Sequence, residues 1–240
     1  MSETSRRVVE LLGETIPYDV RRSPDATKHR IDVDVRGVRV VLPTDSTTDP
    51  EELLSEKAGW VVEKKRKYDD YREQVPDRSF EPGEEFSYLG EPHEVVVERR
   101  SSSVVEDDSL RLAEHHVEET SIKRALETLY RRKARETFEE AADRYAAELG
   151  VAYDKIEIRN QRTKWGSCST SGTLGLNWRL MMAPLPVVEY VVIHELAHLI
   201  EPNHGDDFWE LVADLDPDYT EHANWLEENS ARLVFTEDDL

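Results

Sequence analysis

The 240 residues include 52 Asp and Glu against 31 Lys and Arg, so the net charge at pH 7 is −21. This balance argues against a nucleic-acid partner, because phosphate binding requires clustered Lys and Arg. The start of the chain is polar and no apolar stretch is long enough to span a bilayer, which argues against a signal peptide and a membrane protein. We expect a cytoplasmic protein, and the single cysteine, Cys168, fits a reducing compartment.

The acidic excess is spread along the whole chain, and lysine is scarce beside arginine. Such a surface stays solvated in concentrated salt, so we hypothesise a halophilic source. The alternative is an ordinary acidic cytosolic enzyme.

The first part of the chain, residues 1–112, is predicted to be β-rich with one helix. Short segments with β-branched residues and alternating polarity predict strands at 18–21, 31–35, 38–42, 86–89, 94–99 and 109–112. The helix is predicted from Asp49 to Tyr71, because Asp49 can cap it and Pro50 suits the first helical position.

The second part, residues 113–240, begins with a long predicted helix from about Glu118 to Leu149, which ends at Gly150. Its basic cluster, Arg131 to Arg135, either contacts an acidic partner or forms a solvated face paired with neighbouring glutamates, and the second interpretation is favoured. Two strands, 153–158 and 173–178, are predicted on either side of a loop that contains Trp165, Gly166, Ser167 and Cys168.

The next predicted helix, VVEYVVIHELAHLI, runs from Val187 to Ile200 and is apolar on nearly every face, which predicts a buried helix. Pro184 and Pro186 suit its start, and Pro202 stops it. Two histidines and a carboxylate inside such a helix are costly without partners, and a metal ion supplies one. The alternative is that these are core histidines with hydrogen-bond partners in the protein.

His194 and His198 are four residues apart, so both imidazoles project from one face of the helix and can reach a single ion. His204 follows the turn at Pro202 and approaches from outside the helix, before a helix that Asp206 can cap. A catalytic zinc ion has three protein ligands and one bound water, and Glu195 stands where a general base belongs. The pattern predicts one zinc per chain and hydrolysis of peptide bonds.

Several segments around these histidines resemble the YgjP-like zinc metallopeptidases, a group related to the gluzincin and SprT-like peptidases. The segments are WGSC at 165–168, NWRL at 177–180, YVV at 190–192, HELAH at 194–198, NH at 203–204 and FW at 208–209. The N-terminal part resembles the family more weakly, at 29–43, around Trp60 and at 86–90. The resemblance implies that His194, His198 and His204 bind zinc, that Glu195 is the base, and that the partner is a peptide or protein substrate.

Taken together, the patterns predict an α+β fold in which a β-rich part over 1–112 precedes a zincin-like metallopeptidase domain over 113–240. In that domain the active-site helix lies beside a small sheet. We expect the strand at 173–178 to be the edge that binds an extended substrate. Asn177 and Arg179 either touch substrate or hold the neighbouring loop and helix together by hydrogen bonds.

The second group that stabilises the oxyanion is open among Tyr219, His222 and Arg179. Trp165, Trp178, Trp209 and Trp225 are predicted to be core residues, because each lies in or beside an apolar pattern.

Two other functions remain open. In a metal-stabilised scaffold without turnover, Glu201, Asp206 or Asp207 would supply a fourth ligand, as structural zinc sites require. A SprT-like protease that acts on DNA-bound proteins is the other alternative, which the charge disfavours. Three imidazoles would also accept cobalt, nickel or copper, and zinc is the expected metal.

Overall fold

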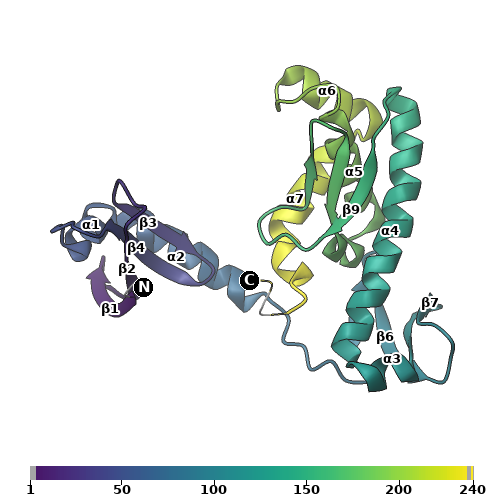
Figure 1. Cartoon of the computed structure of the whole chain (residues 1–240), viewed down its shortest axis with the longest axis horizontal. Helices are drawn as coiled ribbons and strands as arrows, with labels where there is room; N and C mark the ends of the chain where they lie inside the picture. The colour runs from purple at the N-terminus through teal and green to yellow at the C-terminus, as the bar shows by residue number, and fades with distance from the viewer. Residues whose placement is uncertain (1–3, 237–238, 240) are drawn as a thin grey trace. The chain divides into compact units, whose positions relative to one another are not determined.

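The computed structural model describes residues 4–236 and 239. The contacts between residues divide the chain into two compact units, 1–75 and 76–239, and each has a hydrophobic core of its own (Figure 1). Within the described residues, no helix is long and apolar enough to cross a membrane. The mixed α+β fold class is confirmed.

The first unit is a four-stranded sheet with two helices. The strand order is β1-β2-β4-β3, in which the β1/β2 and β3/β4 pairs are antiparallel and the central β2/β4 pair is parallel. The elements are β1 (Thr4–Leu11), β2 (Glu14–Ser23), β3 (Arg30–Asp34), β4 (Gly37–Pro43), α1 (Pro50–Glu56) and α2 (Ala58–Glu73). Ile16, Tyr18 and Val20 alternate along the buried face of β2 and join the core with Leu54 and Val61.

The predicted helix at 49–71 is two helices. The start is as predicted, because the Asp49 side chain accepts a hydrogen bond from Glu51 N and Pro50 occupies the first turn. The break falls at Lys57, whose backbone has φ −114° and ψ 23° and whose N–H donates to Leu54 O. Because the chain leaves helical geometry here, Leu54 of α1 and Val61 of α2 both pack into the core of the first unit.

The second unit begins with a sheet that repeats the connectivity of the first. Its order is β5-β6-β8-β7, again with two antiparallel pairs around a parallel central pair. The strands are β5 (Glu85–Tyr88), β6 (Glu91–Glu98), β7 (Val104–Glu106) and β8 (Ser109–Ala113). The first hairpin of each sheet turns at a Leu-Gly pair with positive φ, Leu12-Gly13 and Leu89-Gly90.

The Leu89-Gly90 turn lies directly against the part of the unit that carries the histidines. Leu89 N donates to Met181 O at 2.7 Å, and a Cβ on Gly90 would lie 3.0 Å from Pro184 Cα. A side chain at residue 90 would therefore push the turn away from Pro184, in addition to the strain that φ +89° imposes.

Two helices follow this sheet, α3 (Glu114–Glu119) and α4 (Ile122–Leu149), where one was predicted. Ser121 has an extended backbone and accepts a hydrogen bond from Arg124 N, so it starts a new helix. Gly150, with φ 67°, ends α4 as predicted. The basic cluster is paired along the helix surface, as the favoured interpretation requires: Arg131 with Glu127, Lys133 with Glu136, and Arg135 with Glu139.

A three-stranded sheet and the C-terminal helices complete the second unit, and α4 packs against both β9 and α5 (Figure 1). The strand order is β10-β11-β9, with β10 antiparallel and β9 parallel to the central β11. The elements are β9 (Lys155–Arg159), β10 (Gly166–Cys168), β11 (Thr173–Asn177), η1 (Trp178–Met182), α5 (Leu185–Ala197), α6 (Asp206–Leu215), α7 (Tyr219–Asn229) and η2 (Ser230–Leu233).

The prediction of a plain loop around Gly166 is wrong, because residues 166–168 form the edge strand β10. The prediction that 173–178 forms a sheet edge is also wrong, because β11 is hydrogen-bonded on both sides. The predicted boundary after residue 112 falls before the last residue of β8, inside the second unit, and a functional division at this point stays a prediction.

Candidate metal centre

Helix α5 carries the first two histidines and is buried nearly all round. Val188, Val192 and Leu196 are fully buried, and a proline occupies its first turn. The helix ends at Ala197 rather than Ile200, because residues 198–200 continue as turns that bond to Leu196 O and Ala197 O. His198 is the C-cap with φ −64° and ψ −14°, so it still lies one turn beyond His194.

His204 comes from the connection between α5 and α6, as expected. The N-cap of α6 is Gly205 rather than the predicted Asp206, so no side chain caps this helix. His204 Nε2 lies 3.0 Å from His194 Nε2, and one ligand nitrogen from each of His194, His198 and His204 lies within 4.8 Å of the others. The structure therefore brings the three predicted ligands together.

The donor set fits a tetrahedral ion. Two nitrogens that each lie about 2.1 Å from such an ion are about 3.4 Å apart, close to the 3.0 Å separation of the two Nε2 atoms. His198 Nδ1 lies 3.1 Å from Glu201 O, so Nδ1 donates to this carbonyl and Nε2 keeps its lone pair. These nitrogens suit zinc and other transition metals.

Hydrogen bonds to the protein do not account for the burial of His194. His194 Nδ1 is buried and has no hydrogen-bond partner among the described residues. Burial, followed by the neighbouring His198 and His204, lowers the pKa of His194 to about 4. Burial, followed by His198, also lowers the pKa of His204. Both rings are therefore neutral at pH 7, the form that binds metal.

Aromatic rings hold the histidines in place. The Phe208 ring lies 4.6 to 4.9 Å from the rings of His194, His198 and His204. Trp209 stacks on His204, and Tyr219 stacks on Trp209 at 5.2 Å. Trp209, which was predicted to be core, is partly buried against the core and also stacks on the third histidine. Its position five residues after His204, at the start of the next helix, was the available signal for this second role.

Glu195 is 6% exposed, and its carboxylate faces strand β10. Burial raises the pKa of Glu195 to about 7, while the charge of Lys164 lowers it. A Cβ on Gly166 would lie 2.3 Å from Glu195 Oε1, so only glycine lets β10 pass this close to the carboxylate. Sequence reasoning did not identify either Lys164 or the role of Gly166.

Asn177 and Arg179 are 0% and 3% exposed, and they hold the β9–β10 connection. Arg179 donates to Gln161 O at 2.7 Å, and Asn177 Nδ2 donates to both Gln161 O and Lys164 O. Of the two roles predicted for them, these contacts match the structural one.

His222 lies near Tyr190, whose ring also contacts the ring of His194. The Tyr190 ring is 5.9 Å from the His194 ring and 6.5 Å from the His222 ring. His222 Nδ1 lies 2.8 Å from Asp216 Oδ2, and Asp216 is buried. Within the described part of the chain, no carboxylate joins the group of potential metal ligands, so Glu201, Asp206 and Asp207 are not brought together with the histidines.

Comparison with known proteins identifies the family of this chain. A family model described as "YgjP-like, metallopeptidase domain" matches residues 27–229. The metallopeptidase zymogen abylysin of Pyrococcus abyssi is 23% identical, with 40% of this chain and 99% of that chain covered and a TM-score of 0.36. The zymogen jannalysin of Methanocaldococcus jannaschii is 21% identical, with 38% and 88% covered and a TM-score of 0.35. No curated protein matches significantly. The family match spans most of the chain, and the chain therefore belongs to the YgjP-like metallopeptidase family.

Proposed function

We propose that this metallopeptidase is a zinc enzyme of the HExxH type that hydrolyses peptide bonds. One zinc per chain is held by His194, His198 and His204, and Glu195 is the general base. The observation that carries the proposal is the convergence of three imidazoles, with one ligand nitrogen from each within 4.8 Å of the others, next to a buried glutamate. When bound, zinc polarises the scissile carbonyl and lowers the pKa of a water molecule.

Glu195 supplies the proton transfer. In the metal-free protein, burial raises the pKa of Glu195 to about 7, and a carboxylate made more basic by burial can accept a proton from water and return it to the leaving amine. Burial beneath β10 keeps this carboxylate away from bulk water, which strengthens its interaction with charge that develops nearby.

The substrate is an extended peptide that adds to β10, the edge strand next to Glu195. Trp165 O accepts from Asn177 N, and Ser169 N donates to Thr173 O, so residues 165, 167 and 169 of this segment bond toward β11. Strand alternation then directs the backbone groups of Gly166 and Cys168 to the opposite, unpaired side. A peptide paired there lies alongside Glu195.

His222 is the best of the three candidates for the second oxyanion donor. Arg179 is committed to the β9–β10 connection, and Tyr219 is stacked on Trp209. Asp216 accepts from His222 Nδ1, which leaves Nε2 free to face a substrate oxygen.

The test is metal content by mass spectrometry, together with cleavage of a peptide library by protein purified in high salt. We expect about one zinc per chain in the wild type and a marked loss in His204→Ala. Glu195→Gln should keep the metal and lose activity by about 10³-fold, because the ligands are intact and the base is gone.

Full activity in Glu195→Gln would refute the assigned base. A scaffold without turnover would instead show four protein ligands and no bound water by X-ray absorption spectroscopy of the zinc-loaded protein.

A further inference from the structure

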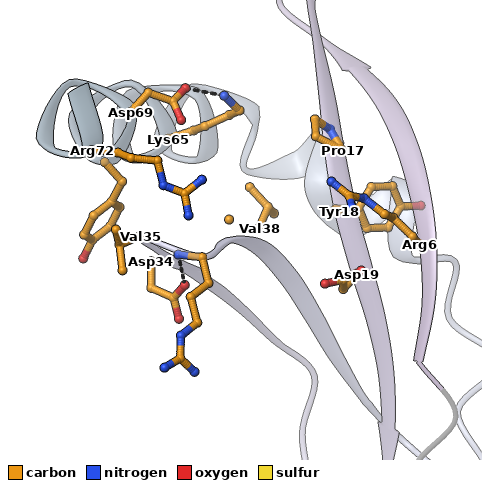
Figure 2. Close-up of a pocket in the computed structure, with 13 residues that line it drawn as sticks. Arg6, Pro17, Tyr18, Asp19, Asp34, Val35, Val38, Lys65, Asp69 and Arg72 are labelled. Carbon is orange, nitrogen blue, oxygen red and sulfur yellow. Dashed lines mark hydrogen bonds and ion pairs between the residues drawn. The ribbon is translucent and has the colours of Figure 1, made fainter. Parts of the chain in front are cut away.

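The first unit contains a cavity that the proposed chemistry does not use. It has a volume of about 220 Å³ and lies where the β3–β4 turn meets the C-terminal half of α2 and the strands β1 and β2 (Figure 2). All of its lining residues belong to residues 6–72, so it lies wholly within one compact unit.

Arg72 points into this cavity from α2, and its guanidinium faces Val38 and the β3–β4 turn (Figure 2). Of the other charged lining residues, Lys65 pairs with Asp69, and Asp34 accepts from Arg36 N. Arg6 and Asp19 lie on the strand side of the cavity (Figure 2). The Arg72 side chain, by contrast, makes no hydrogen bond or ion pair with any residue that the structure describes.

The cavity suits one anionic group with an apolar neighbour. A guanidinium presents paired N–H donors that match the two oxygens of a carboxylate or phosphate. The wall of the cavity beside the guanidinium is apolar and aromatic, formed by Val35, Val38 and Tyr68. Sites for whole small molecules have volumes of roughly 300–1,000 Å³, so this smaller cavity fits a side chain or a head group of a larger ligand.

The distribution of charge between the two units also favours an anionic ligand in the first unit. Residues 1–75 contain 14 Lys and Arg against 16 Asp and Glu, a net charge of −2, whereas residues 76–240 contain 17 against 36, a net charge of −19. An anionic ligand is therefore repelled far less by the net charge of the first unit than by that of the second.

We propose that the first unit is a recognition module and that Arg72 binds an oxyanion of the ligand in this cavity. The ligand group is a carboxylate, as in an acidic or C-terminal peptide residue, or a phosphate, since both present the same pair of oxygens. The site is separate from the histidine cluster and needs neither metal nor turnover.

The test is calorimetric titration of the full-length protein with N-acetylglutamate and with inorganic phosphate, each at constant low ionic strength. We expect saturable binding of one equivalent that weakens as salt is added, because a solvent-exposed ion pair is screened. Arg72→Gln should weaken binding at least about ten-fold. Arg72→Lys should give an intermediate loss, because lysine keeps the charge and loses the planar pair of donors.

Arg30→Gln is the matched control, because Arg30 is an exposed arginine of β3 that pairs with Asp32 outside the cavity; it should bind as wild type does. Saturation by N-acetylglutamate alone identifies a carboxylate ligand, and saturation by phosphate alone identifies a phosphate ligand; both support the site. No saturable binding by the folded wild type, or equal binding by Arg72→Gln, overturns the proposal and leaves the peptidase assignment untouched.

Discussion

The sheets β1–β4 and β5–β8 share one connectivity and differ in what their first turn contacts. In the second unit, Leu89 is partly buried and bonds to Met181, next to the start of the helix that carries His194. In the first unit, the equivalent Leu12 is 73% exposed, and a Cβ on Gly13 would meet nothing. The first turn of the second sheet is therefore packed against the part of its unit that carries the histidines. The first turn of the first sheet is exposed, and the first unit contains an open cavity.

The two units should differ most in the titration of a buried carboxylate, which only the second unit should show. Burial raises the pKa of Glu195 from 4.5 to about 7, so in metal-free protein the folded state binds a proton that the unfolded state releases. The stabilisation is complete below pH 4.5 and is lost as the pH rises toward 7, at most about 3 kcal/mol.

The measurement is urea unfolding of chelator-treated protein between pH 4.5 and 7.5, for wild type and Glu195→Gln. The free energy of unfolding of the wild type should fall relative to that of the variant across this range. Parallel curves would show that the carboxylate is not held in its protonated form.

A second test concerns how closely Gly166 of β10 approaches the carboxylate of Glu195. Gly166→Ala should lower kcat/KM about 10²-fold with zinc content unchanged, because a Cβ 2.3 Å from Glu195 Oε1 displaces the base and none of the ligands. Gly205→Ala is the control: it lies next to His204, yet its Cβ would meet no atom within 4 Å. Equal losses in both variants would argue against this role for Gly166.

A third test compares the two turns directly. Gly13→Ala and Gly90→Ala impose the same backbone strain, since φ is +86° and +89°. Gly90→Ala also forces a methyl group against Pro184, so it should cost about 1.5 kcal/mol more in the free energy of unfolding of its unit. Equal costs in chemical denaturation would mean that the second turn is not packed as tightly as its geometry indicates.

The smallest effect expected is a difference in response to salt. A unit with a net charge of −19 gains more from screening than one with −2, so molar KCl should raise the unfolding temperature of the second unit more than that of the first. Differential scanning calorimetry at several salt concentrations measures both. This result would support the proposed halophilic source, and identical shifts would count against it.

Local rules explain what sequence reasoning predicted well. The cap at Asp49, the proline that follows it and the stop at Gly150 each depend on a few neighbouring residues, and all three are in place. The predictions that were wrong depend on distant partners. Strand β10 has only three residues and forms because β11 pairs with it, so no local sequence pattern predicts this strand.

The spacing of His194 and His198 determined by itself that two imidazoles share one helix face, because the helical repeat is a property of the backbone. Family membership likewise followed from short local motifs. Folding of the chain sets how His204 reaches this pair, beside the rings of Phe208 and Trp209, and how closely β10 approaches Glu195 at Gly166. The contact of Gly166 with Glu195 joins a strand and a helix that are separate in the chain, and the approach of His204 to His194 depends on how the turn between two helices folds back. Shape and burial, rather than residue order, select both contacts.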